Sequence, residues 1–269
     1  MISFKRDGVE LDKSVLVLGD LHGVWRKVNS LIASKKPEIV MQTGDFGWWP
    51  KFHKTTKIST NVHRIDPMYG IRKETGWNQY GLKPGKAKFY FTPGNHEDWE
   101  DLNLLATSDD PVPQEVMPNV FYMPRCATLT LPDGRRVLFI GGAKSTDKEY
   151  RRYRYDWYPE ENITDRDIAN LPAEKVDIVV SHTCPNEFKS EINLRLSSTD
   201  YRVRDSYWLE KWRDSSCQAL SIVLEYYKPE LWFFGHFHIA MTSYWKDTTW
   251  FALNKESSDG WWTYLPKRI

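Results

Sequence analysis

Short apolar runs alternate with amphipathic stretches along the first part of the chain. Three runs rich in β-branched and aromatic residues predict buried strands at Ser14–Gly19, Glu38–Thr43 and Lys88–Thr92. Val24–Ser34, between the first two runs, has apolar residues at helical spacing, and Asp98–Ala106 has the pattern of a short helix. Strands that alternate with helices in this way are expected in a sheet layered with helices.

The second half is dominated by strand-like runs, and one long amphipathic stretch predicts that most of Ser206–Tyr227 is helix. The strand-like runs are Asn119–Tyr122, Ala127–Pro132, Arg135–Gly141, Val176–Ser181, Glu230–Phe234, Met241–Trp245 and Thr249–Leu253. Stretches at about 48–80, 143–163 and 186–204 fit no regular element and are expected to be long loops. Without repeats or linkers, the chain is expected to form a single domain over residues 1–269, with two facing sheets and helices outside.

Composition and charge narrow the class of protein. The 37 Lys and Arg nearly balance the 36 Asp and Glu, which argues against a protein that coats nucleic acid by bulk charge but leaves a local basic patch open. Three scattered cysteines, Cys126, Cys184 and Cys217, fit a reducing compartment better than a disulfide framework. No apolar run approaches the roughly 20 residues that span a bilayer. We therefore expect a soluble, cytoplasmic protein without membrane contact.

Side chains that bind metals follow the ends of five predicted strands. They are Asp20 and His22 in GDLHG, Asp45 in GDFG, Asn95 in GNHED, His182 in SHTCP, and His236 and His238 in GHFH. Loops at the carboxyl ends of strands converge on one site, and Asp-x-His or His-x-His in an extended segment places both side chains on one side. These seven groups are more than the ligands that one tetrahedral zinc ion takes, but they suit two metal ions that share a bridging carboxylate. Nitrogen and oxygen ligands without thiolate favour Mn, Fe, Ni or Zn over Ca.

The motif order GDLHG, GDFG, GNHE, SH and GHFH, from Gly19 to His238, resembles the calcineurin-like metallophosphoesterase superfamily. The resemblance implies an α/β fold, a four-layer αββα sandwich of two mixed sheets with a dinuclear metal site at the strand ends. By motif, it implies that Asp20, His22, Asp45 and His238 hold the first metal, and that Asp45 bridges to a second held by Asn95, His182 and His236. His96 then matches the histidine that donates to the leaving oxygen or stabilises the transition state.

The implied reaction is hydrolysis of a phosphate ester. Two divalent metals, with manganese favoured, would convert a bridging water to hydroxide for in-line attack on phosphorus and would neutralise charge on its oxygens. His96 would donate to the departing alkoxide.

The second motif departs from the protein Ser/Thr phosphatase branch of that family. Trp48 and Trp49 in GDFGWWP stand where that branch carries an aspartate that orients the catalytic histidine and an arginine that grips phosphate. The sequence is more similar to small bacterial and phage-type members. Asp98 is the candidate to orient His96, and Trp48 and Trp49 would form an apolar wall of the pocket.

A basic and aromatic stretch, AKSTDKEYRRYRYDWY at residues 143–158, places Arg151, Arg152 and Arg154 among tyrosines. Such a loop can bind phosphate and stack a base, although a solvated surface loop is the alternative. We therefore predict a phosphodiesterase acting on small nucleotide-like substrates. The alternatives are a DNA or RNA nuclease, a broad-specificity phosphomonoesterase and, least favoured, a non-catalytic scaffold.

Overall fold

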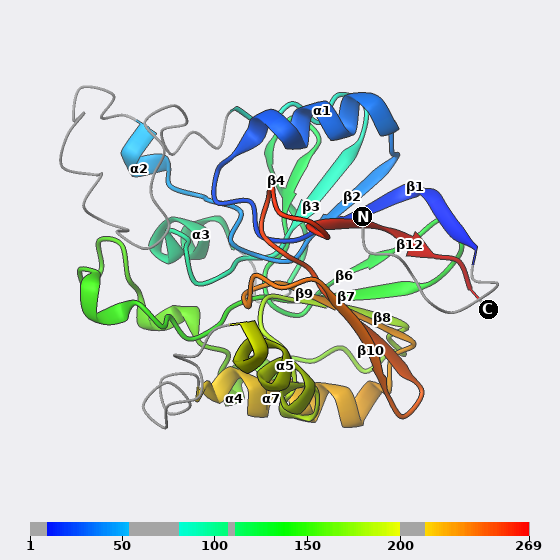
Figure 1. The fold of residues 1–269 in the computed structure, drawn as a ribbon. Helices are drawn as coiled ribbons and strands as arrows, with labels where there is room; N and C mark the ends of the chain where they lie inside the picture. Colours follow the sequence, from blue (N-terminus) through cyan, green and yellow to red (C-terminus); the bar gives the residue numbers. More distant parts are fainter. Residues whose placement is uncertain (1–9, 54–80, 107–110, 200–212, 269) are drawn as a thin grey trace.

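The computed structural model describes residues 10–53, 81–106, 111–199 and 213–268 (Figure 1). The first sheet has the strand order β12-β1-β2-β3-β5-β4. Its strands are β1 (Leu11–Leu18), β2 (Ile39–Gln42), β3 (Lys88–Phe91), β4 (Gln114–Met117), β5 (Val120–Tyr122) and β12 (Trp262–Pro266). The central strands β1, β2, β3 and β5 are parallel, whereas β4 and β12 are antiparallel edges. The first sheet is therefore mixed.

The second sheet repeats this plan with the order β10-β11-β9-β8-β7-β6. Its strands are β6 (Ala127–Thr130), β7 (Arg136–Ile140), β8 (Ile178–Ser181), β9 (Leu231–Phe234), β10 (Met241–Trp245) and β11 (Thr248–Ala252). β7, β8, β9 and β11 are parallel, and β6 and β10 are antiparallel edges. In both sheets the parallel strands end on the side where the candidate site lies.

Helices cover the outer faces of both sheets (Figure 1). α1 (Trp25–Lys35) lies over the first sheet, and α4 (Asp165–Ala169), α5 (Asn186–Thr199) and α7 (Ser215–Tyr227) lie over the second. The shorter α2 (Pro50–His53), α3 (Trp99–Leu105), η3 (Lys148–Tyr150) and η4 (Pro159–Glu161) belong to the loops between strands. The predicted αββα sandwich of two mixed sheets is confirmed.

Alternation along the strands explains the layers. In β1, Val15 and Val17 pack into the core between the sheets, while Leu16 and Leu18 pack beneath α1. In β9, Phe233 faces the core between the sheets, and its neighbours face the helices of the second layer. Because successive strand residues point to opposite faces, a continuous apolar run serves a strand covered on both sides.

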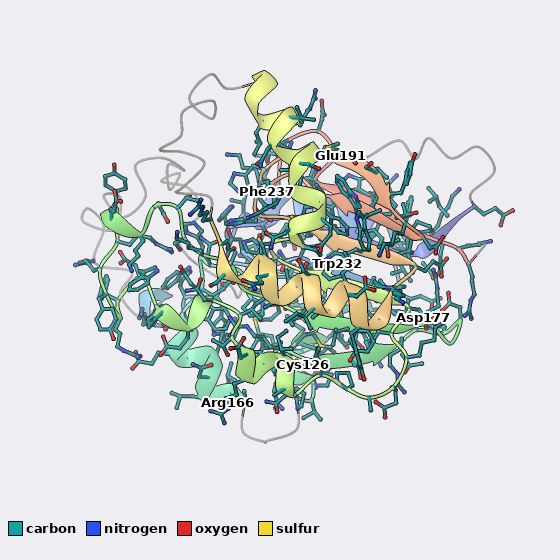
Figure 2. All side chains as sticks on the ribbon, turned by 90° about the horizontal axis from the view of Figure 1, so that it is seen from below. Cys126, Arg166, Asp177, Glu191, Trp232 and Phe237 are labelled. Atoms are coloured by element: carbon teal, nitrogen blue, oxygen red, sulfur yellow. The ribbon has the colours of Figure 1, made fainter. Side chains whose placement is uncertain are left out.

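The outer layer of the second sheet is held by aromatic packing. Phe188 of α5 stacks on Trp250 with ring centroids 5.3 Å apart and meets Trp232 edge to face. Figure 2 shows α5 and α7 crossing this face, with Trp232 between them. Within the described residues, no helix combines the length and the apolar character needed to cross a membrane.

One predicted loop is wrong. Residues 186–199 of the expected 186–204 loop form α5, because Phe188 and Ile192 are buried four residues apart on one helix face. The surrounding polar residues hide this sparse pattern. The expected loop at 143–163 is mostly irregular, with two short 3₁₀ turns, and the expected loop at 48–80 begins with α2. The rest of that loop, 54–80, lies outside the described residues. Residues 200–212 also lie outside them, so the helix predicted over Ser206–Tyr227 is seen from Ser215 onward.

Candidate metal centre

The expected metal ligands lie just beyond the carboxyl ends of central strands. They are Asp20 and His22 after β1, Asp45 after β2, Asn95 after β3, His182 after β8, and His236 and His238 after β9. Four have left-handed backbones: His22 (φ 47°), Asp45 (φ 53°), His236 (φ 64°) and His238 (φ 51°). Non-glycine residues rarely adopt this conformation, and it concentrates at functional sites where the surrounding structure enforces it. The loops are therefore shaped to aim these side chains at one place.

Four side chains form a first cluster. Asp20, His22, Asp45 and His238 each offer one ligand atom, and these atoms lie within 4.8 Å of one another. His238 Nε2 lies 3.0 Å from Asp20 Oδ2 and 3.3 Å from His22 Nε2. Such separations match the edges of a coordination polyhedron whose metal–ligand bonds are about 2.1 Å long.

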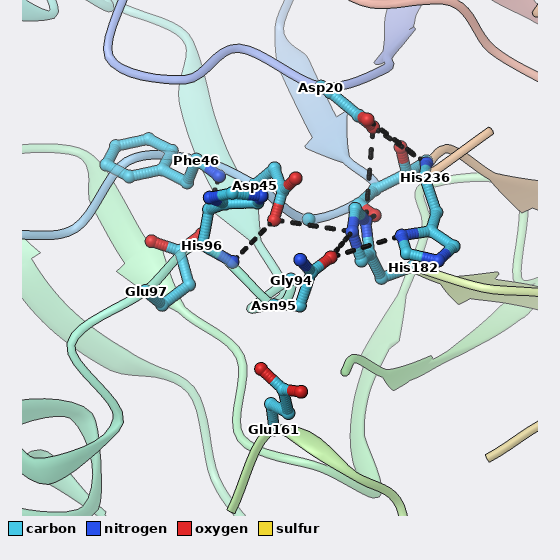
Figure 3. Close-up of polar contacts among 12 residues, drawn as sticks. Asp20, Asp45, Phe46, Gly94, Asn95, His96, Glu97, Glu161, His182 and His236 are labelled. Carbon is cyan, nitrogen blue, oxygen red and sulfur yellow. Dashed lines mark hydrogen bonds and ion pairs between the residues drawn. The ribbon is translucent and has the colours of Figure 1, made fainter. Parts of the chain in front are cut away.

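A second cluster lies beside the first (Figure 3). Asn95 Oδ1 lies 3.0 Å from His182 Nε2 and 3.1 Å from His236 Nδ1. His182 Nε2 is also 3.3 Å from Asp45 Oδ1. An amide oxygen, a carboxylate oxygen and two imidazole nitrogens therefore converge on a second point.

Asp45 stands between the clusters. Its Oδ2 faces His22 Nε2 at 3.7 Å, and its Oδ1 faces His182 Nε2 at 3.3 Å. The backbone N–H of His96 donates to Oδ1 over 2.8 Å and helps fix the carboxylate. One oxygen per cluster is the geometry of a bridging carboxylate.

The donor set fits divalent metal ions. His182 Nδ1 donates to the carbonyl of Thr43 over 2.9 Å, which directs Nε2 toward the cluster. The Asn95 amide donates to Ser145 Oγ over 3.1 Å, so its oxygen is the atom turned inward. Carboxylate and amide oxygens only accept, so a cation at their focus satisfies them together.

The same groups set the protonation of the cluster. Burial lowers the pKa of His182, but the carboxylates of Asp45 and Asp20 outweigh it and raise the pKa to about 9. Burial raises the pKa of Asp45, yet the histidines around it hold that pKa well below its ordinary value. Burial, followed by the charge of His182, lowers the pKa of His236 to about 3. Without a metal, the ionised carboxylates therefore favour positive charge on His182, whereas burial disfavours it on His236.

Two glycines allow the close approach of the loops. A Cβ on Gly94 would lie 2.1 Å from Asp45 Oδ1, and a Cβ on Gly235 would lie 1.9 Å from Asp20 Oδ1. Both contacts are far inside van der Waals distance, so any side chain would displace a ligand.

Glu97 holds the loop that carries Asp45. Its fully buried carboxylate accepts from the backbone N–H groups of Phe46 and Trp48, each over 2.6 Å, and of Gly47 over 3.1 Å. Burial, followed by the charge of Asp45, raises the pKa of Glu97 to about 8, while the backbone N–H groups of Trp48 and Phe46 lower it. Glu97 thus takes up three backbone donors of a loop without regular structure.

His96, the expected catalytic histidine, lies at the edge of the first cluster. Its ring centroid is 5.3 Å from that of His22, in a T-shaped arrangement. Its Nδ1 lies 3.1 Å from a guanidinium nitrogen of Arg151, and its Nε2 lies 3.9 Å from Asp147 Oδ2. Burial and then the charge of Arg151 hold the pKa of His96 well below its ordinary value.

The expectation that Asp98 orients His96 needs correction. Asp98 lies 3.2 Å from Lys51 Nζ, accepts from the Tyr158 hydroxyl over 2.9 Å, and caps α3. These contacts direct its carboxylate into the packing of α3. Asp147 is the carboxylate that the structure pairs with the His96 ring.

Ser145 connects the second cluster to a buried acid. Its hydroxyl donates to Glu161 Oε2 over 2.6 Å and accepts from the Asn95 amide. The Ser145 backbone N–H and the Trp157 indole also donate to Glu161. Burial raises the pKa of Glu161 to about 7, although these donors lower it. The Asn95 amide is thereby held in one orientation.

The expected apolar wall of Trp48 and Trp49 is wrong. Their exposed fractions are 4% and 1%, so neither offers surface to a pocket. Trp48 stacks on Phe91 in the core beneath α1 and donates to Asp101. Trp49 packs in an aromatic cluster with Trp99 and Tyr158. Both tryptophans stabilise the loop after Asp45 by packing.

The three arginines of the 143–158 loop diverge. The Arg151 side chain is 2% exposed and reaches the His96 ring. Arg152 and Arg154 are exposed, the first with its guanidinium 3.8 Å from the Tyr155 ring centroid and the second paired with Glu160. Three tyrosines of the loop expose large fractions: Tyr150 65%, Tyr153 64% and Tyr155 38%. The loop thus exposes aromatic and basic groups, while its Arg151 contacts His96.

A shallow hollow adjoins the second cluster. Its lining includes Lys144, Lys189, Thr146 and the metal-ligand candidate His236. Asp214 also lines it, and its Oδ2 accepts from the Lys144 backbone N–H. Two lysines beside the ligand candidate His236 make this surface suitable for an anionic group.

Four residues of the site were not predicted from the sequence. They are Glu97, Ser145, Asp147 and Glu161. Glu97 adjoins His96 in GNHED, and Ser145 and Asp147 lie in GGAKSTDKEYR. Their places in these two motifs could have marked them as candidate site residues. Glu161 had no signal, because only the fold brings it to Ser145.

Comparison with known families identifies the class. A sequence model of the calcineurin-like phosphoesterase family matches residues 13–240, which include every ligand candidate. The chain belongs to this family of divalent-metal-dependent hydrolases of phosphoester bonds. A search of curated protein sequences finds no match.

Three solved structures are similar in outline. A phosphopantetheinyl hydrolase from Mycobacterium tuberculosis is 12% identical with a TM-score of 0.48, covering 94% of this chain and 95% of its own. GAP50, the anchor in the inner membrane complex of Plasmodium, is 11% identical with a TM-score of 0.41, covering 95% and 78%. A candidate 5′-nucleotidase from Staphylococcus aureus in complex with alpha-ketoglutarate is 13% identical with a TM-score of 0.41, covering 90% and 48%.

Proposed function

We propose that this protein is a phosphodiesterase acting on small nucleotide-like substrates through two divalent cations, with manganese as the preferred metal. The observation that carries the proposal is the position of Asp45, whose two oxygens face two separate groups of ligand atoms. The first cation would be held by Asp20, His22, Asp45 and His238, and the second by Asp45, Asn95, His182 and His236. When bound, such a pair activates water and neutralises charge on the phosphoryl oxygens.

The chain's own residues supply the remainder of the chemistry. His96 lies at the edge of the cluster, where its ring can donate to the leaving oxygen of the substrate. Glu97 and Ser145 hold the ligand loop and the Asn95 amide, so the ligands require little rearrangement. This preorganisation lets the site stabilise a transition state rather than merely bind an ion.

The preference for a nucleotide-like diester rests on the exposed groups of the 143–158 loop, whose Arg151 contacts His96. Arg152, Arg154 and the exposed tyrosines of the same loop offer cations and flat rings suited to phosphate and base. The lysines of the hollow beside His236 extend the basic surface. Trp48 and Trp49, in the positions of the protein phosphatase aspartate and arginine, are packing residues, which disfavours that branch.

A substrate panel tests the proposal. The purified protein with Mn²⁺ is assayed against p-nitrophenyl phosphate, bis(p-nitrophenyl) phosphate, cyclic nucleotides, and single-stranded DNA and RNA. We expect turnover of the diesters and cyclic nucleotides to exceed that of the monoester. Hydrolysis of the monoester alone would overturn the diesterase preference. Cleavage of polymers alone, with steep salt dependence, would identify a nuclease instead.

A further inference from the structure

Arg151 differs from the other arginines of its loop because it turns inward. Its side chain is 2% exposed, whereas that of Arg154 is 45% exposed. An arginine buried this completely requires partners for its planar set of donors. Those partners define what Arg151 does.

The Arg151 guanidinium is hydrogen-bonded to the chain segment that carries Asn95 and His96. Nη1 and Nη2 donate to the Asn95 carbonyl over 3.2 and 3.3 Å, and Nη1 donates to Ser145 Oγ over 2.6 Å. Asp147 Oδ1 lies 3.6 Å from Nη1 and balances the charge. This fork fixes the guanidinium plane, which a single ammonium group could not do.

The remaining contact sets the chemistry of His96. Arg151 Nη2 lies 3.1 Å from His96 Nδ1. A guanidinium has no acceptor and stays charged, so Nδ1 must be the acceptor. In a neutral imidazole the proton then resides on Nε2, on the side of Asp147 Oδ2, 3.9 Å away.

We propose that Arg151 is a positioning residue of the reaction, which holds His96 as the Nε2–H tautomer and so makes Nε2 the atom that donates to the leaving oxygen. The inference rests on the proposed function, in which His96 is the donor. The neutral imidazole keeps its proton and stabilises the leaving oxygen by a hydrogen bond from Nε2–H. The guanidinium fork on the Asn95 carbonyl ties the direction of this N–H to a candidate metal ligand. Arg151 therefore orients the donor and does not touch the substrate.

The test measures the tautomer and the turnover in the same variants. Protein with ¹⁵N-labelled histidine, loaded with diamagnetic Zn²⁺, is examined by long-range ¹H–¹⁵N correlation, with His96→Gln assigning the resonances. We expect a protonated Nε2 and a bare Nδ1 for His96 in the wild type. In Arg151→Met the Nδ1–H form should appear, and kcat for a cyclic nucleotide of the panel, whose leaving alkoxide depends on the donor, should fall by about 10- to 100-fold with little change in KM.

Two further variants control the result. Arg151→Lys keeps a donor near Nδ1 but loses the fork, so it should recover part of the turnover and part of the Nε2–H signal. It also serves if Arg151→Met folds poorly. Arg136 is the first residue of β7 and pairs with Glu174. Arg136→Met should match the wild type in both the His96 tautomer and kcat.

Two results would overturn the inference. One is a wild-type His96 protonated on Nδ1, and the other is an Arg151→Met protein with unchanged tautomer and kcat. A wild type that hydrolyses none of the panel would instead contradict the proposed function. The spectrum then still decides whether Arg151 sets the tautomer.

Discussion

The side-chain amide of Asn95 donates to the hydroxyl of Ser145, 3.1 Å away, and this bond turns the Asn95 oxygen toward the second cluster. Ser145 in turn donates to the buried Glu161. The side chain of Asn95, a candidate ligand that could otherwise rotate freely, is therefore held by a chain of hydrogen bonds outside the cluster. Such outer contacts tune metal sites by fixing the orientation of the ligands.

Replacing Ser145 tests that chain. Ser145→Ala removes the acceptor that orients the Asn95 amide, so affinity for the second cation should fall by about 10- to 100-fold while the first site is retained. Calorimetric titration with Mn²⁺ resolves the two sites. Ser221→Ala in α7, whose hydroxyl bonds only within the helical layer, should leave both affinities unchanged. Equal affinities in the Ser145 and Ser221 variants would contradict this role of Ser145.

The buried carboxyl of Glu161 should make stability depend on pH. Burial raises its pKa from 4.5 to about 7, so the folded state binds more protons than the unfolded state between these values. Its contribution to stability is greatest at low pH and is lost as pH rises toward 7, by about 1.4 kcal/mol for each pH unit that separates the folded and unfolded pKa values. Urea unfolding at pH 5 and pH 8 should show Glu161→Gln gaining stability relative to the wild type at the higher pH. A difference that does not vary with pH would exclude this role.

A single methyl group should disable the first cluster. Gly235→Ala places a Cβ 1.9 Å from Asp20 Oδ1, which must move. We expect more than about a 10-fold loss of turnover, together with loss of metal measured by elemental analysis. Gly134→Ala is the matched control, because Gly134 has φ +85° and an added Cβ there meets no atom within 4 Å. It should cost about 1 kcal/mol of stability and leave turnover unchanged. Similar turnover in the two variants would be inconsistent with the steric argument.

Replacing Asp98 and Asp147 should distinguish a residue that stabilises the fold from one that supports the reaction. Asp98→Asn weakens the contacts with Lys51 and Tyr158, so it should reduce stability by about 1 to 3 kcal/mol with turnover nearly unchanged. Asp147→Asn removes the carboxylate facing His96 Nε2 and the counter-charge of Arg151, so it should reduce turnover by about 10-fold or more. Thermal unfolding and steady-state kinetics on both variants check the pair. The reverse pattern would restore the role first expected of Asp98.

Local patterns were sufficient where a residue's role follows from its own segment. The apolar runs before Asp20, Asp45 and His182 predicted strands, and the fold brings the ends of those strands together. The same reasoning failed for α5, whose buried face is limited to a few residues such as Phe188 and Ile192.

Roles that depend on contacts distant in sequence could not be predicted. Trp48 and Trp49 were expected beside the pocket because they follow Asp45. In the fold, Trp48 packs on Phe91 and Trp49 packs on Tyr158, and both are buried. Asp98 was expected beside His96 because it is close in sequence, yet α3 begins there and turns its carboxylate away. Arg151 was expected to meet substrate, and only the fold shows that its guanidinium contacts Asn95 and His96.

In the proposed phosphoester hydrolase, two cations share the carboxylate of Asp45. The most direct test follows hydrolysis of bis(p-nitrophenyl) phosphate while Mn²⁺ is added to metal-free wild type and to Asp45→Asn. Wild-type turnover should rise to a plateau at about two equivalents. Asp45→Asn should remain folded, bind less metal and lose at least about 100-fold in turnover. A plateau at one equivalent, or wild-type turnover in Asp45→Asn, would contradict this shared role of Asp45.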